Sequence, residues 1–129
     1  MLLTGDYTPL LPALTAMHVR QFVLEYATPR AGDIGVVGRA LSGSVPGTDL
    51  PREIGLGVVN PRTTEAETPE FIVQKAEAAL EYYRPRQVFL NTDCGFGCFA
   101  NRCVNVEDIA AAKLKSIVAA ARILRERYG

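Results

Sequence analysis

The three cysteines of this chain are the residues best suited to chemistry, and they all lie in one short segment. Cys94, Cys98 and Cys103 lie in the 13 residues after the apolar run Gln87 to Leu90. Their spacing differs from the spacings of zinc fingers and iron–sulfur sites, so a local metal cluster is not indicated. Cys94 is then a metal ligand, a nucleophile or a small buried apolar residue, whereas Cys98 and Cys103 are expected to pack. A thiol-redox pair of Cys94 and Cys98 is a minor alternative, because the C-x-x-C spacing is absent.

Polar side chains stand at the end of each of three apolar segments. The first segment ends at Glu25, Asn60 follows the second, and Asn91, Asp93 and Cys94 follow the third. Because the carboxyl ends of parallel strands meet at one edge of a sheet, these side chains are expected to face a common mouth. A carboxylate and a thiolate that meet there form a plausible half of a zinc site.

Simpler interpretations of these residues stay open. Glu25 could form an ion pair with Arg30, and Cys94 could be buried without function. His18, the only histidine, precedes the first apolar segment, so we expect it at the opposite end from Glu25 in a structural or exposed position. The glycines from Gly32 to Gly38 give a GxxGxxG pattern, which is a weak phosphate-binding signal because no strand comes directly before it.

The elements that must position these residues alternate between helices and strands. Capping residues, prolines and apolar periodicity predict helices over Thr8–Met17, Thr68–Tyr83 and Val106–Arg127, and a weaker helix over Ile34–Leu41. Short apolar runs predict strands over Arg20–Tyr26, Ile54–Val59 and Gln87–Leu90. Strands that are separated by helices of this length favour right-handed crossovers and a parallel sheet.

The predicted fold class is therefore α/β, with about three parallel strand–helix units. The strands are apolar without alternation, which is typical of strands covered on both faces. We expect the last helix to bury one face, formed by Leu114, Ile117, Val118, Ala121 and Leu124. A complete (β/α)8 barrel needs about 250 residues, so the chain is either an open three-stranded sheet or part of a barrel.

Composition excludes several classes of function. The chain has 129 residues, with 14 basic and 14 acidic side chains, and no basic stripe that would favour nucleic acid. No apolar run approaches the roughly 18 residues that span a bilayer. The amino-terminal segment MLLTGDYTPLLP is a poor signal peptide, so we expect a cytoplasmic protein with reduced thiols.

Several segments carry a resemblance to a known family. LNTDCGFG, Leu90 to Gly97, resembles the N-P-D-C-G zinc-cysteine loop of cobalamin-independent methionine synthases. LEYATPRAGD, Leu24 to Asp33, resembles the segment of that family that holds a zinc-ligand glutamate. IGLGVVNPRTTEAETPEFI, Ile54 to Ile72, and the closing AKLKSIVAAARILRERYG resemble the family's intervening unit and last helix.

The resemblance implies a fold, an activity and a metal. The family's catalytic domain is a (β/α)8 barrel that transfers a methyl group from a methyl donor to the thiol of homocysteine, which zinc holds. Glu25 and Cys94 would be zinc ligands. Asn91, Asp93 and Asn60 would be second-shell or substrate-contacting residues. Cys98 and Cys103 match no ligand of the family and keep no assigned role.

The chain departs from the family at its beginning. A His-x-Cys pair supplies two further zinc ligands shortly before a Gly-[Asn/Asp]-Tyr in the family, but here Met1 and Leu3 stand at those positions before Gly5-Asp6-Tyr7. The resemblance thus implies a single carboxyl-terminal partial barrel domain over residues 1–129, with a weak or partial zinc site. A partner chain or a homo-oligomer would supply the rest of the barrel. The alternative is a non-catalytic remnant or interaction module of the same fold.

Overall fold

The computed structural model describes residues 7–27, 33–61, 63–93 and 107–129. A 3₁₀ turn, Thr8–Leu10, leads into α1, Leu11–Ala16, and a second 3₁₀ turn, Pro85–Gln87, leads into the last strand. The remaining elements are β1 (Gln21–Glu25), α2 (Ile34–Leu41), β2 (Glu53–Val59), α3 (Pro69–Ala79), β3 (Val88–Thr92) and α4 (Glu107–Tyr128). The predicted order of helices and strands is confirmed.

The three strands form one parallel sheet in the order β1-β2-β3. β2 is the central strand and is buried along almost its whole length, whereas β1 and β3 are edge strands. The register places Val23 opposite Gly55 and Gly55 opposite Phe89. The next row of the same face joins Glu25, Gly57 and Asn91, because side chains two residues apart point to one side of a strand.

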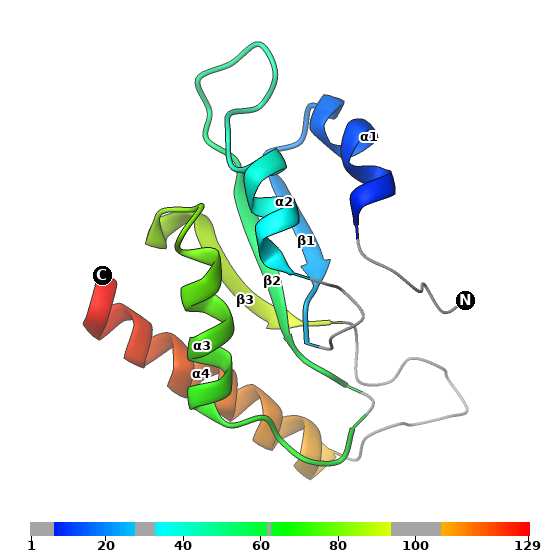
Figure 1. Ribbon diagram of the computed structural model, residues 1–129. Coiled ribbons are helices and arrows are strands. Elements are labelled where there is room, and N and C mark those ends of the chain that lie inside the picture. The colour runs from blue at the N-terminus through cyan, green and yellow to red at the C-terminus, as the bar shows by residue number, and fades with distance from the viewer. Residues whose placement is uncertain (1–6, 28–32, 62, 94–106) are drawn as a thin grey trace.

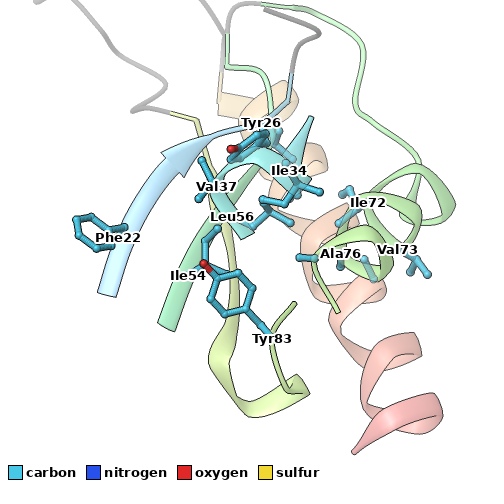
Figure 2. Packing of buried hydrophobic residues seen from close by; sticks show 14 of the residues in the cluster. Phe22, Tyr26, Ile34, Val37, Ile54, Leu56, Ile72, Val73, Ala76 and Tyr83 are labelled. Atoms are coloured by element: carbon cyan, nitrogen blue, oxygen red, sulfur yellow. The ribbon is translucent and has the colours of Figure 1, made fainter. Parts of the chain in front are cut away.

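Helices cover the other face of the sheet and form the core with it. Figure 1 shows α2 and α3 over that face, and α4 packs against α3 and contacts β2 and β3. Figure 2 shows buried side chains gathered in one cluster, from α2 (Ile34, Val37), β2 (Leu56) and α3 (Ile72, Ala76). The weakly predicted helix α2 is thus a core element, and Asp33 caps it by accepting a hydrogen bond from the Gly35 N–H at 3.0 Å.

The glycines of α2 serve helix packing. A Cβ at Gly35 would lie 2.8 Å from the Tyr82 hydroxyl oxygen, and a Cβ at Gly38 would collide with the Tyr82 ring. Both glycines therefore allow the chain after α3 to approach α2 closely. In the described part of the GxxGxxG pattern, close packing accounts for the glycines without a phosphate.

The amino-terminal edge of the sheet is fastened by a buried arginine. Arg52, 2% exposed, donates from Nη2 to the backbone oxygens of Thr15 and Met17, each at 2.8 Å. Its guanidinium carbon lies 5.3 Å from the centre of the Phe22 ring, and Gln87 Nε2 donates to its backbone oxygen at 2.6 Å. One side chain thus ties the end of α1 to the starts of the strands.

The expectation that both faces of the sheet are covered is wrong for this chain. Val23 is 61% exposed and Phe89 46% exposed, and both lie on the face opposite the helices, which we call the open face. The error has a physical reason. On the open face, β2 has glycines, and side chains of the neighbouring strands and of Asp93 cover them. The continuous apolar run of β2 therefore did not require a second layer of helices or strands.

The predicted inward face of the last helix is partly wrong. Ile117 and Leu124 pack on the core, but Leu114 is 48% exposed and Val118 is 51% exposed. Lys113 and Ala120 are the buried residues of α4. The apolar stripe on this helix is wider than the surface that α3 and the sheet cover, and its exposed Val118 lines a surface groove with Phe89 and Leu90 of β3. None of the described helices is long and apolar enough to cross a membrane.

Candidate functional site

The predicted site residues that the structure describes lie at the carboxyl-terminal edge of the sheet, which we call the rim; they are Glu25, Asn60, Asn91 and Asp93. Glu25 and Asn91 stand in one row of the open face, on either side of Gly57. Two strand spacings place their backbones about 9.5 Å apart. Glu25 is exposed and Asn91 is half-buried. The side chains of Val23 and Asn91 lie over Gly55, and the side chain of Asp93 lies over Gly57.

Asp93 connects the two edge strands across the central one. It follows β3, and its Oδ1 accepts hydrogen bonds from the backbone N–H groups of Tyr26 and Ala27, each at 3.2 Å. A Cβ at Gly57 would collide with Asp93 Oδ1 and would lie 2.8 Å from the Leu24 carbonyl oxygen. Gly57 is therefore required for this bridge, which holds the end of β1 against the end of β3.

The carboxyl group of Asp93 has an altered acidity. Burial raises the pKa of Asp93 to about 6, the Ala27 and Tyr26 N–H groups oppose that rise, and the charges of Glu25 and Glu67 add to it. The pKa lies above its ordinary value because desolvation of the charged form outweighs the two hydrogen bonds. The carboxyl groups of Glu25 and Glu67 are thus near enough to influence the acidity of Asp93.

Tyr7 fastens the outer edge of β1 at Glu25. Its hydroxyl donates to the Glu25 backbone oxygen at 3.1 Å and accepts from the Glu25 N–H at 2.9 Å. Its ring lies 5.5 Å from that of Tyr26, and partial burial raises the pKa of the Tyr7 hydroxyl. The backbone of the proposed zinc-ligand glutamate is therefore held from both sides, by Tyr7 outside and by β2 inside.

Asn60 opens the segment that follows β2 at the same rim. Its N–H donates to Glu67 Oε2 at 2.6 Å, and its backbone oxygen accepts from Lys113 Nζ at 2.8 Å. Asp93 lies beside the end of β2, because its own N–H donates to the Val59 carbonyl oxygen at 2.9 Å. Asn60 is half-buried. The sequence prediction that these strand ends share one edge is confirmed for the described residues.

Other predicted residues lie outside the described residues. These are Cys94, Cys98 and Cys103, and Arg30, the alternative partner of Glu25. Among the residues that the structure does describe, no group of three or more His, Cys, Asp and Glu side chains could hold a metal ion. His18 is exposed and precedes β1, away from the rim, as expected.

Two features of the rim were missed from the sequence. Lys113 is fully buried and bonds to the segment after β2, although a lysine is ordinarily an exposed residue. A signal existed, because Lys113 lies on the helical stripe of Ile117, Ala120 and Leu124. Gly57 was interpreted only as part of an apolar run, since its role depends on Asp93, which is distant in sequence.

Comparison with known proteins finds methionine synthases that are similar to this chain in sequence. The chain is 33% identical to a methionine synthase of Pyrococcus abyssi over 110 residues, which are 85% of this chain and 28% of that protein. It is 33% identical to a methionine synthase of Sulfurisphaera tokodaii over 75 residues, 58% of this chain and 20% of that protein. No model of a protein family matches the chain.

A solved structure shares the fold. A B12-independent methionine synthase from Shewanella sp. W3-18-1, in complex with selenomethionine, aligns with a TM-score of 0.76 at 17% identity, over 95% of this chain and 32% of that one. The predicted class, α/β with three parallel strand–helix units of a partial (β/α)8 barrel, is confirmed. The resemblance to cobalamin-independent methionine synthases is confirmed as well, and the chain spans under a third of the curated relatives it matches.

Proposed function

We propose that this chain supplies the carboxyl-terminal part of a zinc-dependent site for methyl transfer to the thiol of homocysteine. The proposal has one main support. Asp93, which directly precedes Cys94 in the chain, reaches across Gly57 and accepts hydrogen bonds from the backbone N–H groups directly after Glu25. Similarity to proteins named methionine synthase supplies the reaction class.

The chemistry of the donors fits zinc in part. Glu25 offers an exposed carboxylate at the rim and Cys94 a thiol, and both are common zinc ligands. Zinc would favour the thiolate of a bound substrate, whose thiol, with a pKa of about 8.5, is mostly protonated at neutral pH. Two ligands are fewer than a tight zinc site needs, and Met1 and Leu3 stand where the family has its other two.

This chain's own residues would orient the ligands. Asp93 and Tyr7 hold the backbone around Glu25, while Asn91 and Asn60 stand beside it at the rim. Asn91 Nδ2 donates to the Thr92 carbonyl oxygen at 2.9 Å, so its side-chain oxygen faces Gly55 on the open face. These groups would hold the zinc ligands in place and present polar atoms to the amino-acid part of the substrate.

A partner would complete the site. The open face exposes Val23 and Phe89, α4 exposes Leu114 and Val118, and β3 is an edge strand of the described sheet. Exposed apolar side chains next to an unpaired strand edge favour association. We propose that a polypeptide with the remaining barrel strands, or a second copy of the chain, covers these surfaces within one partial barrel domain over residues 1–129.

Zinc binding tests the proposal directly. We expect the purified chain to bind zinc weakly in a competition assay with a chromogenic chelator, and Glu25→Gln and Cys94→Ser each to weaken that binding at least tenfold. Cys98→Ser and Cys103→Ser are the matched controls and should bind like the parent chain. Equal affinity in all five proteins would contradict the proposed ligands.

The alternative function is a non-catalytic interaction module of the same fold. The exposed apolar side chains of the open face and of α4 favour it, because they suit association whether or not zinc is bound. Light scattering with and without zinc separates the two. Association that persists in the Glu25→Gln variant, without any zinc affinity in the parent chain, would favour the module.

A further inference from the structure

Lys113 stands at the centre of a ring of oxygen atoms. Its side chain is fully buried, and among the described residues the acceptors of its Nζ come from the segment Asn60–Glu67. The contacts are the Asn60 oxygen at 2.8 Å, Thr63 Oγ1 at 2.8 Å, the Glu65 oxygen at 2.9 Å and Glu67 Oε1 at 3.0 Å. An ammonium group has three N–H donors, so these four acceptors occupy all three of them.

The segment folds around this ammonium group. Asn60 and Glu67, at its two ends, are joined by the bond from the Asn60 N–H to Glu67 Oε2 at 2.6 Å. Thr63 Oγ1 also lies 3.3 Å from the Asn60 oxygen and 3.4 Å from the Glu65 oxygen. Several oxygens converge on one point. Without a cation there they would repel one another, and the single hydroxyl proton of Thr63 could not serve all of them. The conformation of the segment therefore depends on a residue of another element.

The same segment lies at the rim. It begins at the end of β2, where the Asp93 N–H donates to the Val59 carbonyl oxygen, and the charge of Glu67 reaches the Asp93 carboxyl group. Loss of the Lys113 charge would free the Asn60–Glu67 segment to move beside Asp93. It would also leave the acidic charge of Glu67 without its partner.

We propose that Lys113 is a positioning residue, which fixes the Asn60–Glu67 segment and through it the rim that bears Asn60 and Asp93. The segment's dependence on the ammonium group stands on the contacts alone. The consequence for zinc rests on the proposed function. No contact between Lys113 and substrate is needed, since the side chain is enclosed by protein.

Hydrogen–deuterium exchange of the metal-free chain tests the first step. In Lys113→Ala, we expect the Asn60 amide, which donates to Glu67 Oε2, to exchange at least tenfold faster, while the amides of β2 keep their protection. Lys115→Ala is the matched control, because Lys115 is an exposed lysine on the same helix. Faster exchange spread evenly over the whole chain would show a merely structural role and overturn the proposal.

Chemical rescue separates the ammonium group from the lost packing. Propylammonium should restore protection of the Asn60 amide in Lys113→Ala, or restore folding if the variant is unfolded alone. Tetramethylammonium carries the charge without an N–H donor and should not. Equal effects of both cations, or of neither, overturn the proposal. Glu67→Gln, which keeps Lys113, provides a second test: unchanged exchange of the Asn60 amide in it would also overturn the proposal.

Zinc affinity of the same variants tests the second step. A Lys113→Ala chain whose Asn60 amide exchanges faster should bind zinc at least threefold more weakly, and propylammonium should reverse this. If exchange responds but zinc affinity does not, the link to the rim fails. If the parent chain binds no zinc, the proposed function fails, while the exchange result still stands for Lys113.

Discussion

The two ends of the sheet are each fastened by one buried cation, but in different ways. Arg52 at the amino-terminal edge donates to backbone oxygens of Thr15 and Met17, which end a helix, and lies over the Phe22 ring. Lys113 at the carboxyl-terminal rim donates to a segment that has no regular structure and includes the carboxylate of Glu67. The first arrangement joins elements that are already formed. The second shapes a loop.

The difference agrees with the separate roles of the two edges of the sheet in parallel α/β proteins. The amino-terminal edge of such sheets serves stability, and the carboxyl-terminal edge carries function. At the amino-terminal edge of this chain, Gln87 and Phe22 surround Arg52 with no acidic partner among its contacts in the described residues. At the rim, carboxylates gather at Glu25, Glu67 and Asp93. Three carboxyl groups therefore lie at the edge where a metal site is proposed.

The largest effect is expected at the amino-terminal edge. Arg52→Met should lower the free energy of unfolding by about 3 kcal/mol, because two backbone oxygens lose a charged donor in a buried place. Urea denaturation measures the loss. Zinc affinity at a urea concentration that leaves both proteins folded should stay at the parent value. A tenfold drop in zinc affinity would contradict the proposal that the amino-terminal edge serves stability and the rim serves metal binding.

A smaller loss of stability, with a loss of zinc binding, is expected at the rim. Gly57→Ala should cost about 2 kcal/mol, because its Cβ would meet the Leu24 carbonyl oxygen at 2.8 Å and collide with Asp93. The displaced Asp93 bridge should also weaken zinc binding. Gly43→Ala is the control, since nothing lies within 4 Å of a Cβ there. Unchanged zinc affinity in a destabilised Gly57→Ala would contradict a role of the bridge in the site.

The smallest effect is expected from the electrostatics of the rim, because Asp93 is only half-buried and solvent screens its charge. Because the pKa of Asp93 is raised from 3.8 to about 6 in the folded state, the native chain holds more protons than the unfolded chain between those values. Stability of the metal-free chain should therefore fall as pH rises from about 4 to about 6, relative to Asp93→Asn, and stay level above that range. Denaturation midpoints of both proteins across this pH range measure the difference. A difference of the opposite sign would show that the two backbone N–H groups outweigh desolvation.

The order of elements and the parallel sheet could be predicted from the sequence, for local reasons. Thr68 caps α3 through the Phe71 N–H, and Pro69 suits its first turn. The helix nevertheless ends at Ala79, before the predicted Tyr83, because the N–H groups of Tyr82 and Tyr83 both turn back to the Ala79 oxygen. Its carboxyl-terminal boundary depends on packing against α2, which no local pattern records.

The sequence predicted which strand ends form the site, but it did not predict the hydrogen bonds that join them. That Glu25, Asn60, Asn91 and Asp93 share an edge follows from strand direction alone. That Asp93 reaches across Gly57 to the backbone after β1 depends on the register of three strands. The register is set by packing across the sheet, so it does not appear in any one segment.

By itself, the sequence determined the alternation of helices and strands, the rim at which the polar strand ends meet, and the likeness to methionine synthases. Periodicity, capping and strand direction depend on residues that are close to one another in the sequence. Only the tertiary structure decided that one face of the sheet stays open, that Gly57 makes room for Asp93, and that Lys113 is enclosed by the segment Asn60–Glu67. Burial is a property of all the surrounding elements together, and so the same lysine that would be exposed on an isolated helix becomes the centre of a loop.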